Sequence, residues 1–305
     1  LLSIFFISGL IFVFSGNAFA YDGYQNPIRV LLAETGSAPS ITITYGTYQV
    51  FNSSGAVTKT VSAGSSVPLA AGEKLSSVNG YGHFKYGSYE YRGDLTYKGG
   101  CIVNTVGLEQ YLYSVVMLEI GGYAPDVEGL KAQAVASRNY ACLKLKTPRN
   151  TNYDIYCTTT DQVYRGYSGE SYSSPVAERV RQAVDATAGL VMYYNGALVN
   201  AIYMANAGGC TETAENVWGG DYGYLQGISC PWDALPFCGD AGSYKSMKMP
   251  TGYEWTVPLS FADLASKLGY GGTITDVAVS HEGCVSGYAK GVTITGTKGS
   301  VTYKG

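Results

Sequence analysis

The stretch GLEQYLYSVVMLEIGGYAPDVEGLKAQAVASRNYACLKL, residues 107–145, decides the fold, because its pattern predicts two helices joined by a loop. The first half carries a short apolar face that stops at a pair of glycines. In the second half, Pro125 and Asp126 mark the start, since proline is tolerated in a first helical turn and an acidic side chain complements the helix dipole there. Small and apolar residues then recur at steps of three or four, the spacing of a packed helix face: Val127, Leu130, Ala134, Ser137, Ala141 and Leu145.

Glu119 ends the apolar run VVMLEI, directly before Gly121 and Gly122. A carboxyl group among apolar neighbours loses hydration, so its neutral form is favoured and its pKa tends to rise. A general acid that works near neutral pH needs such a shift. A solvated surface glutamate fits the same pattern, so the pattern by itself leaves both interpretations open.

The chain has 305 residues, a net charge of −3, 14% charged residues, 40 glycines and 28 tyrosines. This composition lacks the basic stripe that a phosphate backbone requires, so we expect no nucleic-acid binding. Tyrosine richness suits strands with one packed and one wet face, and it also suits clefts that stack sugars. The length allows one large domain or two smaller ones.

Residues 1–20 form an apolar segment that ends in Ala18-Phe19-Ala20, a small-x-small cleavage pattern. We expect a signal peptide cleaved after Ala20, with an uncleaved signal anchor as the alternative, and therefore a protein that acts outside the cytoplasm. The sequence starts without methionine and ends inside a strand-like pattern, so we expect further residues at both ends.

Seven cysteines in an exported chain permit disulfides. Cys230 with Cys238 is the first candidate pair, and Cys142 with Cys157 is the second. The sequence has only two histidines and no CxxC pair, so we predict no metal and no cofactor.

We expect an α+β fold, with a β-rich N-terminal region (21–106) and a β-rich C-terminal part (191–305) around a helical core (107–190). Short alternating or apolar runs separated by Gly and Ser predict the strands. Further helices are predicted over 175–187 and near 260–268, and Asn195-Gly196 predicts a hairpin. The polar stretch 147–167 is predicted to be a loop that lines a cleft beside Glu119, although a plain surface loop fits as well.

Five segments in order resemble the family of stage II sporulation protein D and the LytB amidase enhancers, abbreviated SpoIID/LytB. The resemblance runs from about Ile28 to the chain end, which makes 21–305 a single SpoIID-like domain. LKAQAVASRNYA is its most specific part. The segments are YRGDL (91–95), VNTVGLEQYLYSVVMLE (103–119), EGLKAQAVASRNYA (128–141), TDQVYRGYSGE (160–170) and NAGGCTETAENVWGG (206–220).

The resemblance implies a peptidoglycan lytic transglycosylase at the cell wall, which cuts between N-acetylmuramic acid and N-acetylglucosamine after an amidase has removed the stem peptides. It places the catalytic acid on Glu119. A hydrolase needs two carboxylates to manage water and leaving group, whereas here the C6 hydroxyl of the sugar attacks and one carboxyl group is sufficient. The LytB branch implies an alternative, a non-catalytic partner that binds peptidoglycan and stimulates an amidase, together with a membrane partner.

Other residues are expected to bind substrate. Lys131 and Arg138 are seven residues apart and share a helix face. One of them is expected to hold the muramyl lactyl carboxylate or to tune Glu119. Gly208-Gly209 lets backbone approach a ligand closely. The remaining expected contacts are Tyr140, Gln162, Tyr164 and Thr211.

Overall fold

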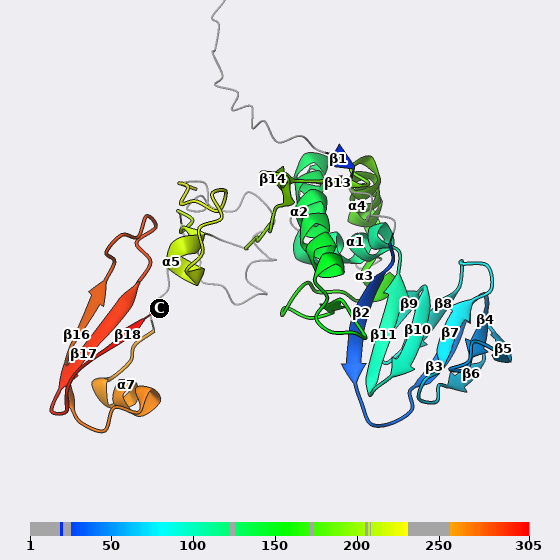
Figure 1. Ribbon diagram of the computed structural model, residues 1–305, viewed down its shortest axis with the longest axis horizontal. Coiled ribbons are helices and arrows are strands. Elements are labelled where there is room, and N and C mark those ends of the chain that lie inside the picture. The colour runs from blue at the N-terminus through cyan, green and yellow to red at the C-terminus, as the bar shows by residue number, and fades with distance from the viewer. Residues whose placement is uncertain are drawn as a thin grey trace, which may run out of the picture. The chain divides into compact units, whose positions relative to one another are not determined.

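The computed structural model describes residues 19–20, 26–121, 126–170, 174–204, 207, 209–230 and 257–304. The chain divides into two compact units, Leu1–Ile202 and Tyr203–Gly305. Helices and several sheets are both present, so the predicted α+β class is confirmed (Figure 1).

The N-terminal part of the first unit consists of two sheets. The seven-stranded sheet has the order β12-β2-β11-β10-β7-β4-β5, and the four-stranded sheet has the order β6-β3-β8-β9 (Figure 1). The strands show alternating burial of their side chains. In β3, for example, Ile41 and Ile43 are buried and Thr42 between them is partly exposed. The strands are β2 (Ile28–Glu34), β3 (Ser40–Tyr45), β4 (Thr47–Phe51), β5 (Val57–Ser62), β6 (Ser66–Pro68), β7 (Lys74–Ser77), β8 (His83–Tyr86), β9 (Tyr89–Arg92), β10 (Asp94–Lys98), β11 (Cys101–Val106) and β12 (Ile155–Tyr156).

The predicted helix pair is confirmed. Helix α1 (Leu108–Val116) continues directly into a π-helical turn, η2 (Met117–Gly121), and α2 spans Val127–Lys146. The Asp126 side chain accepts a hydrogen bond of 2.9 Å from the Gly129 N–H and so caps α2. Two further helices complete this layer, α3 (Gly166–Glu170) and α4 (Ser174–Ala186).

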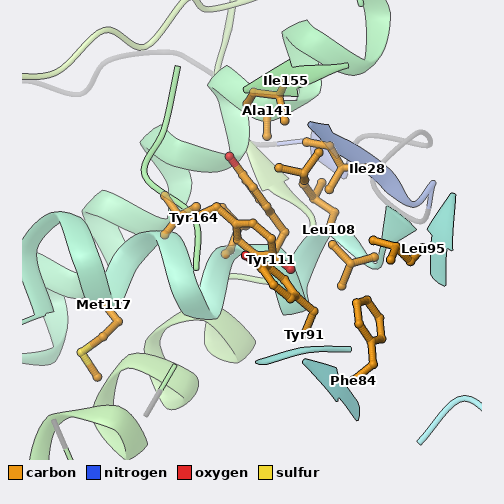
Figure 2. Packing of buried hydrophobic residues seen from close by; sticks show 14 of the residues in the cluster. Ile28, Phe84, Tyr91, Leu95, Leu108, Tyr111, Met117, Ala141, Ile155 and Tyr164 are labelled. Atoms are coloured by element: carbon orange, nitrogen blue, oxygen red, sulfur yellow. The ribbon is translucent and has the colours of Figure 1, made fainter. Parts of the chain in front are cut away.

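One continuous core joins the helices to the sheets. Leu108 and Tyr111 of α1 belong to the same buried cluster as Ile28, Phe84 and Leu95 of the strands (Figure 2). Each of these five side chains is almost completely removed from solvent. The start of α1 is therefore packed against the sheets.

The first unit ends in short pieces: β13 (Leu190–Val191), β14 (Tyr193–Tyr194) and β15 (Ala197–Leu198), with β1 (Phe19–Ala20) paired to β13. The predicted hairpin is confirmed, because β14 pairs with β15 around Asn195 and Gly196, both at positive φ. The second strand of the hairpin ends at Leu198.

The second unit contains α5 (Ala214–Trp218), α7 (Phe261–Leu268) and a three-stranded sheet of β16 (Ile274–Ser280), β17 (Gly291–Gly296) and β18 (Gly299–Lys304). Helix α7 confirms the helix predicted near 260–268, and the Asp263 N–H donates to its capping residue, Ser260. Tyr270, Ile274 and Ile294 form the small core of this unit.

The second candidate disulfide is wrong. Cys142 and Cys157 are free thiols, Cys142 is packed in the core, and burial raises the pKa of its thiol to about 12. Cys238 of the first candidate pair lies outside the described residues, as do residues 1–18 of the expected leader. No helix in the described part of the chain is long and apolar enough to cross a bilayer.

Candidate active site

Glu119 lies in η2, the π-helical turn that follows α1. Its neighbour Met117 is buried, while Glu119 itself is half-buried. Turn η2 contacts α2, α3 and α4, so Glu119 is located where the helices of the first unit meet. Single π-helical turns inside α-helices occur frequently at functional sites. The sequence pattern gave the apolar run before Glu119 but not this turn.

The stretch 147–167, predicted to line a cleft beside Glu119, contacts this residue at one point. The backbone N–H of Val163 donates to the Glu119 Oε1 atom at 3.3 Å. A few residues on, the Arg165 N–H donates to the Ser114 hydroxyl of α1 at 3.1 Å. The stretch is thus fixed to α1 and η2 at two points, and the first of them is the candidate acid.

Gln162 and Tyr164 point into the core, so the expectation that they contact sugar does not agree with their position. Each exposes 3% of its surface or less. The Tyr111 hydroxyl donates to Gln162 Oε1 at 3.0 Å, and the Tyr164 hydroxyl donates to Asn104 Oδ1 at 2.8 Å. Successive side chains of an extended chain point to opposite sides, so Gln162 and Tyr164 share one side. The backbone of Val163, which lies between them, contacts Glu119.

We predict that Tyr164→Phe lowers the free energy of unfolding by about 1–2 kcal/mol, because it leaves the buried Asn104 carbonyl oxygen without its donor. Asn104 also donates to the carbonyls of Arg92 and Asp94, so the loss affects two strands. Urea unfolding measures the change. A variant as stable as the parent but impaired in sugar binding would contradict the structural role.

Arg138 is also a structural residue. Its side chain has 0% exposure and forms an ion pair of 2.6 Å with Glu109 of α1. It further donates to the carbonyls of Val184 and Leu190. The expectation that Arg138 reaches a substrate carboxylate therefore does not agree with its position, because all three guanidinium nitrogens donate hydrogen bonds within the first unit. Lys131 and Arg138 share a helix face, but they do not share the same exposure to solvent.

Lys131 and Tyr140 differ from Arg138 in accessibility. Lys131 is half-buried and forms an ion pair of 2.7 Å with the exposed Glu128 one turn earlier, the kind of surface pair that ligands can displace. Tyr140 is half-buried, and its hydroxyl donates to Asp161 Oδ1 at 2.6 Å. Burial acts to raise the pKa of Asp161, but hydrogen bonds from Arg149 and Tyr140 outweigh it and hold the pKa below its usual value.

The remaining expected contacts belong to the second unit. Gly209 is in the left-handed region at φ +94°, where a side chain is strained. The Thr211 hydroxyl donates to the Gln226 carbonyl at 3.1 Å and accepts from the Ile228 N–H at 2.8 Å. Thr211 thus fastens its own loop. Gly208 lies outside the described residues.

The sequence profile of the SpoIID family, described as stage II sporulation protein, matches residues 96–194. This segment contains α1, η2 with Glu119, α2 and the 162–170 stretch. This segment belongs to the SpoIID family.

Three curated proteins illustrate how far the likeness extends. An uncharacterized protein of Brachyspira hyodysenteriae is 32% identical over 227 residues, which cover 67% of this chain and 58% of that protein. The amidase enhancer of Bacillus subtilis is 39% identical over 100 residues (33% of this chain, 12% of that protein). Stage II sporulation protein D of Bacillus subtilis is 29% identical over 166 residues (50% and 46%).

The chain spans less than two thirds of the length of each of these relatives. The SpoIID segment thus relates the chain to proteins named for stage II sporulation and to one named amidase enhancer.

A second carboxylate of the SpoIID segment was not singled out from the sequence. Glu170 is 2% exposed and pairs with Arg92 of β9 at 2.7 Å. Burial raises the pKa of Glu170 to about 7, and the nearby Arg92 and Arg181 act in the opposite direction. Its position at the end of TDQVYRGYSGE was the available signal, but nothing in the pattern indicated burial.

This shift predicts a pH dependence of stability. The folded-state pKa is higher than the ordinary value of 4.5, so the native state binds the proton more tightly than the unfolded chain does. Stability contributed by Glu170 is therefore complete below about pH 4.5 and is lost as pH rises to about 7. We expect the free energy of unfolding of the parent to fall by about 3 kcal/mol more than that of Glu170→Gln between pH 4.5 and pH 8. Urea unfolding at the two pH values measures this difference. If the free energy of unfolding changed equally in the parent and in Glu170→Gln, the role of burial would be contradicted.

Proposed function

We propose that this protein is a lytic transglycosylase that cleaves the glycan strands of peptidoglycan between N-acetylmuramic acid and N-acetylglucosamine, with Glu119 as its acid and base. The observation that carries the proposal is the location of Glu119. It is half-buried in the π-helical turn of the SpoIID segment, and the Val163 N–H donates to its carboxyl group. A positioned carboxyl group beside apolar residues is suited to proton transfer.

The chemistry needs one carboxyl group. Protonated Glu119 gives its proton to the glycosidic oxygen as the bond from that oxygen to C1 of N-acetylmuramic acid breaks. The C6 hydroxyl of the same sugar then attacks C1, and the Glu119 carboxylate takes the hydroxyl proton. The products are a 1,6-anhydro-muramyl end and a new N-acetylglucosamine end, and the acid is returned to its starting state.

Lys131 is our candidate for the muramyl lactyl carboxylate. It lies near the start of α2, the helix that follows the Glu119 turn, and it forms an ion pair with the exposed Glu128. Arg138 is a less suitable candidate because of its burial. Tyr140 is proposed to contact sugar with its ring, since its hydroxyl is engaged by Asp161. Gly208, Gly209 and Thr211 remain proposed sugar contacts of the second unit.

The relative named amidase enhancer supports a second candidate function, a partner that binds peptidoglycan and stimulates an N-acetylmuramoyl-L-alanine amidase without cutting glycan. In either role we propose that the N-terminal segment directs the protein out of the cytoplasm, as a secreted or membrane-anchored wall protein, and that a membrane partner accompanies it. A role in sporulation or in wall remodelling fits both candidates.

Purified protein incubated with peptide-stripped glycan strands separates the two. Mass spectrometry that finds 1,6-anhydro-muramyl ends supports the transglycosylase. A matched incubation of intact peptidoglycan with an amidase, with and without this protein, tests the enhancer. Faster stem-peptide release without anhydro ends would replace the first proposal with the second.

A further inference from the structure

A row of aromatic and cationic side chains crosses the four-stranded sheet. Tyr45 of β3 is the cross-strand partner of His83 of β8, and His83 is the partner of Arg92 of β9. Directly opposed residues point to the same face of a sheet. The ring centroids of Tyr45 and His83 are 5.8 Å apart.

A fourth side chain comes from the stretch beside the candidate acid. The centroid of the Tyr167 ring lies 4.0 Å from that of His83, and the Arg92 guanidinium lies 4.9 Å from the Tyr167 ring. The Ser168 hydroxyl accepts from the Glu90 N–H at 2.9 Å, which fixes the stretch along the edge of β9. Gly166 permits this approach, since a Cβ there would lie 2.5 Å from the Glu90 carbonyl oxygen.

Tyr45, His83, Arg92 and Tyr167 together form what we call the aromatic platform. Tyr45 exposes 62% of its surface, so its ring is accessible to a ligand. Burial and the charge of Arg92 lower the pKa of His83, so its ring is neutral at pH 7. The exposed Lys85 and half-buried Glu90 are opposed on the same face and supply polar groups beside the rings.

The platform lies close to Glu119 along the chain. Val163 donates to Glu119, and Tyr167 follows four residues later. Four residues span at most about 14 Å even when fully extended. A polymer bound at Glu119 therefore reaches the platform within a few of its repeating units.

We propose that the aromatic platform binds the glycan strand of peptidoglycan at sugars beyond the bond that is cut. The proposal rests on the proposed function, since it extends that site. A pyranose ring presents C–H groups on its faces and hydroxyl or amide groups at its rim. Aromatic faces bordered by a cation and by polar side chains match both parts. A protein partner would favour a broader, contiguous apolar patch, whereas the charged Lys85 and Glu90 lie on this face beside the rings.

Binding of peptide-stripped glycan strands to the protein in a Glu119→Gln background, in which the strands are not consumed, tests this. We expect Tyr45→Ala to weaken binding about tenfold, which is the fold-change of about one stacking contact. Tyr45→Phe keeps the ring and should bind within about twofold of the parent. Tyr194→Ala, which removes a tyrosine exposed to 42% from the β14–β15 hairpin, is the matched control and should also stay within about twofold.

Thermal unfolding of each variant checks the fold, and we expect little change for Tyr45→Ala because this side chain is 62% exposed. Glycan binding that is unchanged in Tyr45→Ala, or that falls equally in Tyr194→Ala, would contradict the proposed role of the aromatic platform. So would an effect of Tyr45→Ala on amidase binding alone. Tyr45-dependent binding by a parent that makes no anhydro ends would retain the platform and reject the transglycosylase, so the two proposals fail separately.

Discussion

Glu119→Gln is expected to reduce the formation of 1,6-anhydro-muramyl ends by about 100-fold to 10,000-fold, the usual contribution of a general acid–base group. Glutamine has the shape of glutamate but no proton to give to the glycosidic oxygen. It still has an oxygen that accepts from the Val163 N–H, so we expect the stability of the variant to remain within about 1 kcal/mol of the parent. The rate of release of anhydro ends, measured by mass spectrometry, checks the prediction.

Two further variants make the result specific. Glu119→Asp keeps the acid but withdraws it by one methylene, so its rate should lie between those of the parent and Glu119→Gln. Glu178→Gln removes an exposed glutamate of α4 that pairs with Arg181, and it should leave the rate unchanged. Glu119→Gln with parental activity would exclude Glu119 as the acid.

The sequence predicted most elements where one periodicity dominates. The alternation in β3 and the three- and four-residue steps in α2 record which side faces the core, and both elements are where the pattern indicated. Capping residues locate the start of a helix more precisely. The side chains of Asp126 and Ser260 accept hydrogen bonds from backbone N–H groups that have no partner within the helix, and such groups occur only in its first turn. Strand β8 consists of only His83–Tyr86 and contains one buried residue, so it offers little alternation for a sequence pattern to detect.

The site was harder to predict because it depends on contacts between distant segments. Glu119 was located by its apolar neighbours, but the donor at Val163 is 44 positions away and leaves no local signal. Gln162 and Tyr164 were chosen for their polar groups, yet those groups satisfy partners in the core. Polarity indicates that a partner is needed and does not say whether that partner is sugar or protein.

The same ambiguity affected Arg138, and its burial yields the second large prediction. Arg138→Met is expected to lower the free energy of unfolding by about 3–5 kcal/mol, because it leaves Glu109 without its cation in a largely desolvated position. The guanidinium also links α2 to the end of α4 and to β13 through the carbonyls of Val184 and Leu190. Urea unfolding of the two proteins at the same pH measures the loss.

Matched variants separate the lost ion pair from a general effect of replacing a cation in α2. Lys131→Met, on the same helix but at a surface pair, should change the free energy of unfolding by less than about 1 kcal/mol. Glu109→Leu combined with Arg138→Met should be more stable than Arg138→Met alone, since no charge is then left without a partner. A double variant less stable than Arg138→Met would mean that packing of the arginine stem, rather than its charge, holds α1, α2 and α4 together.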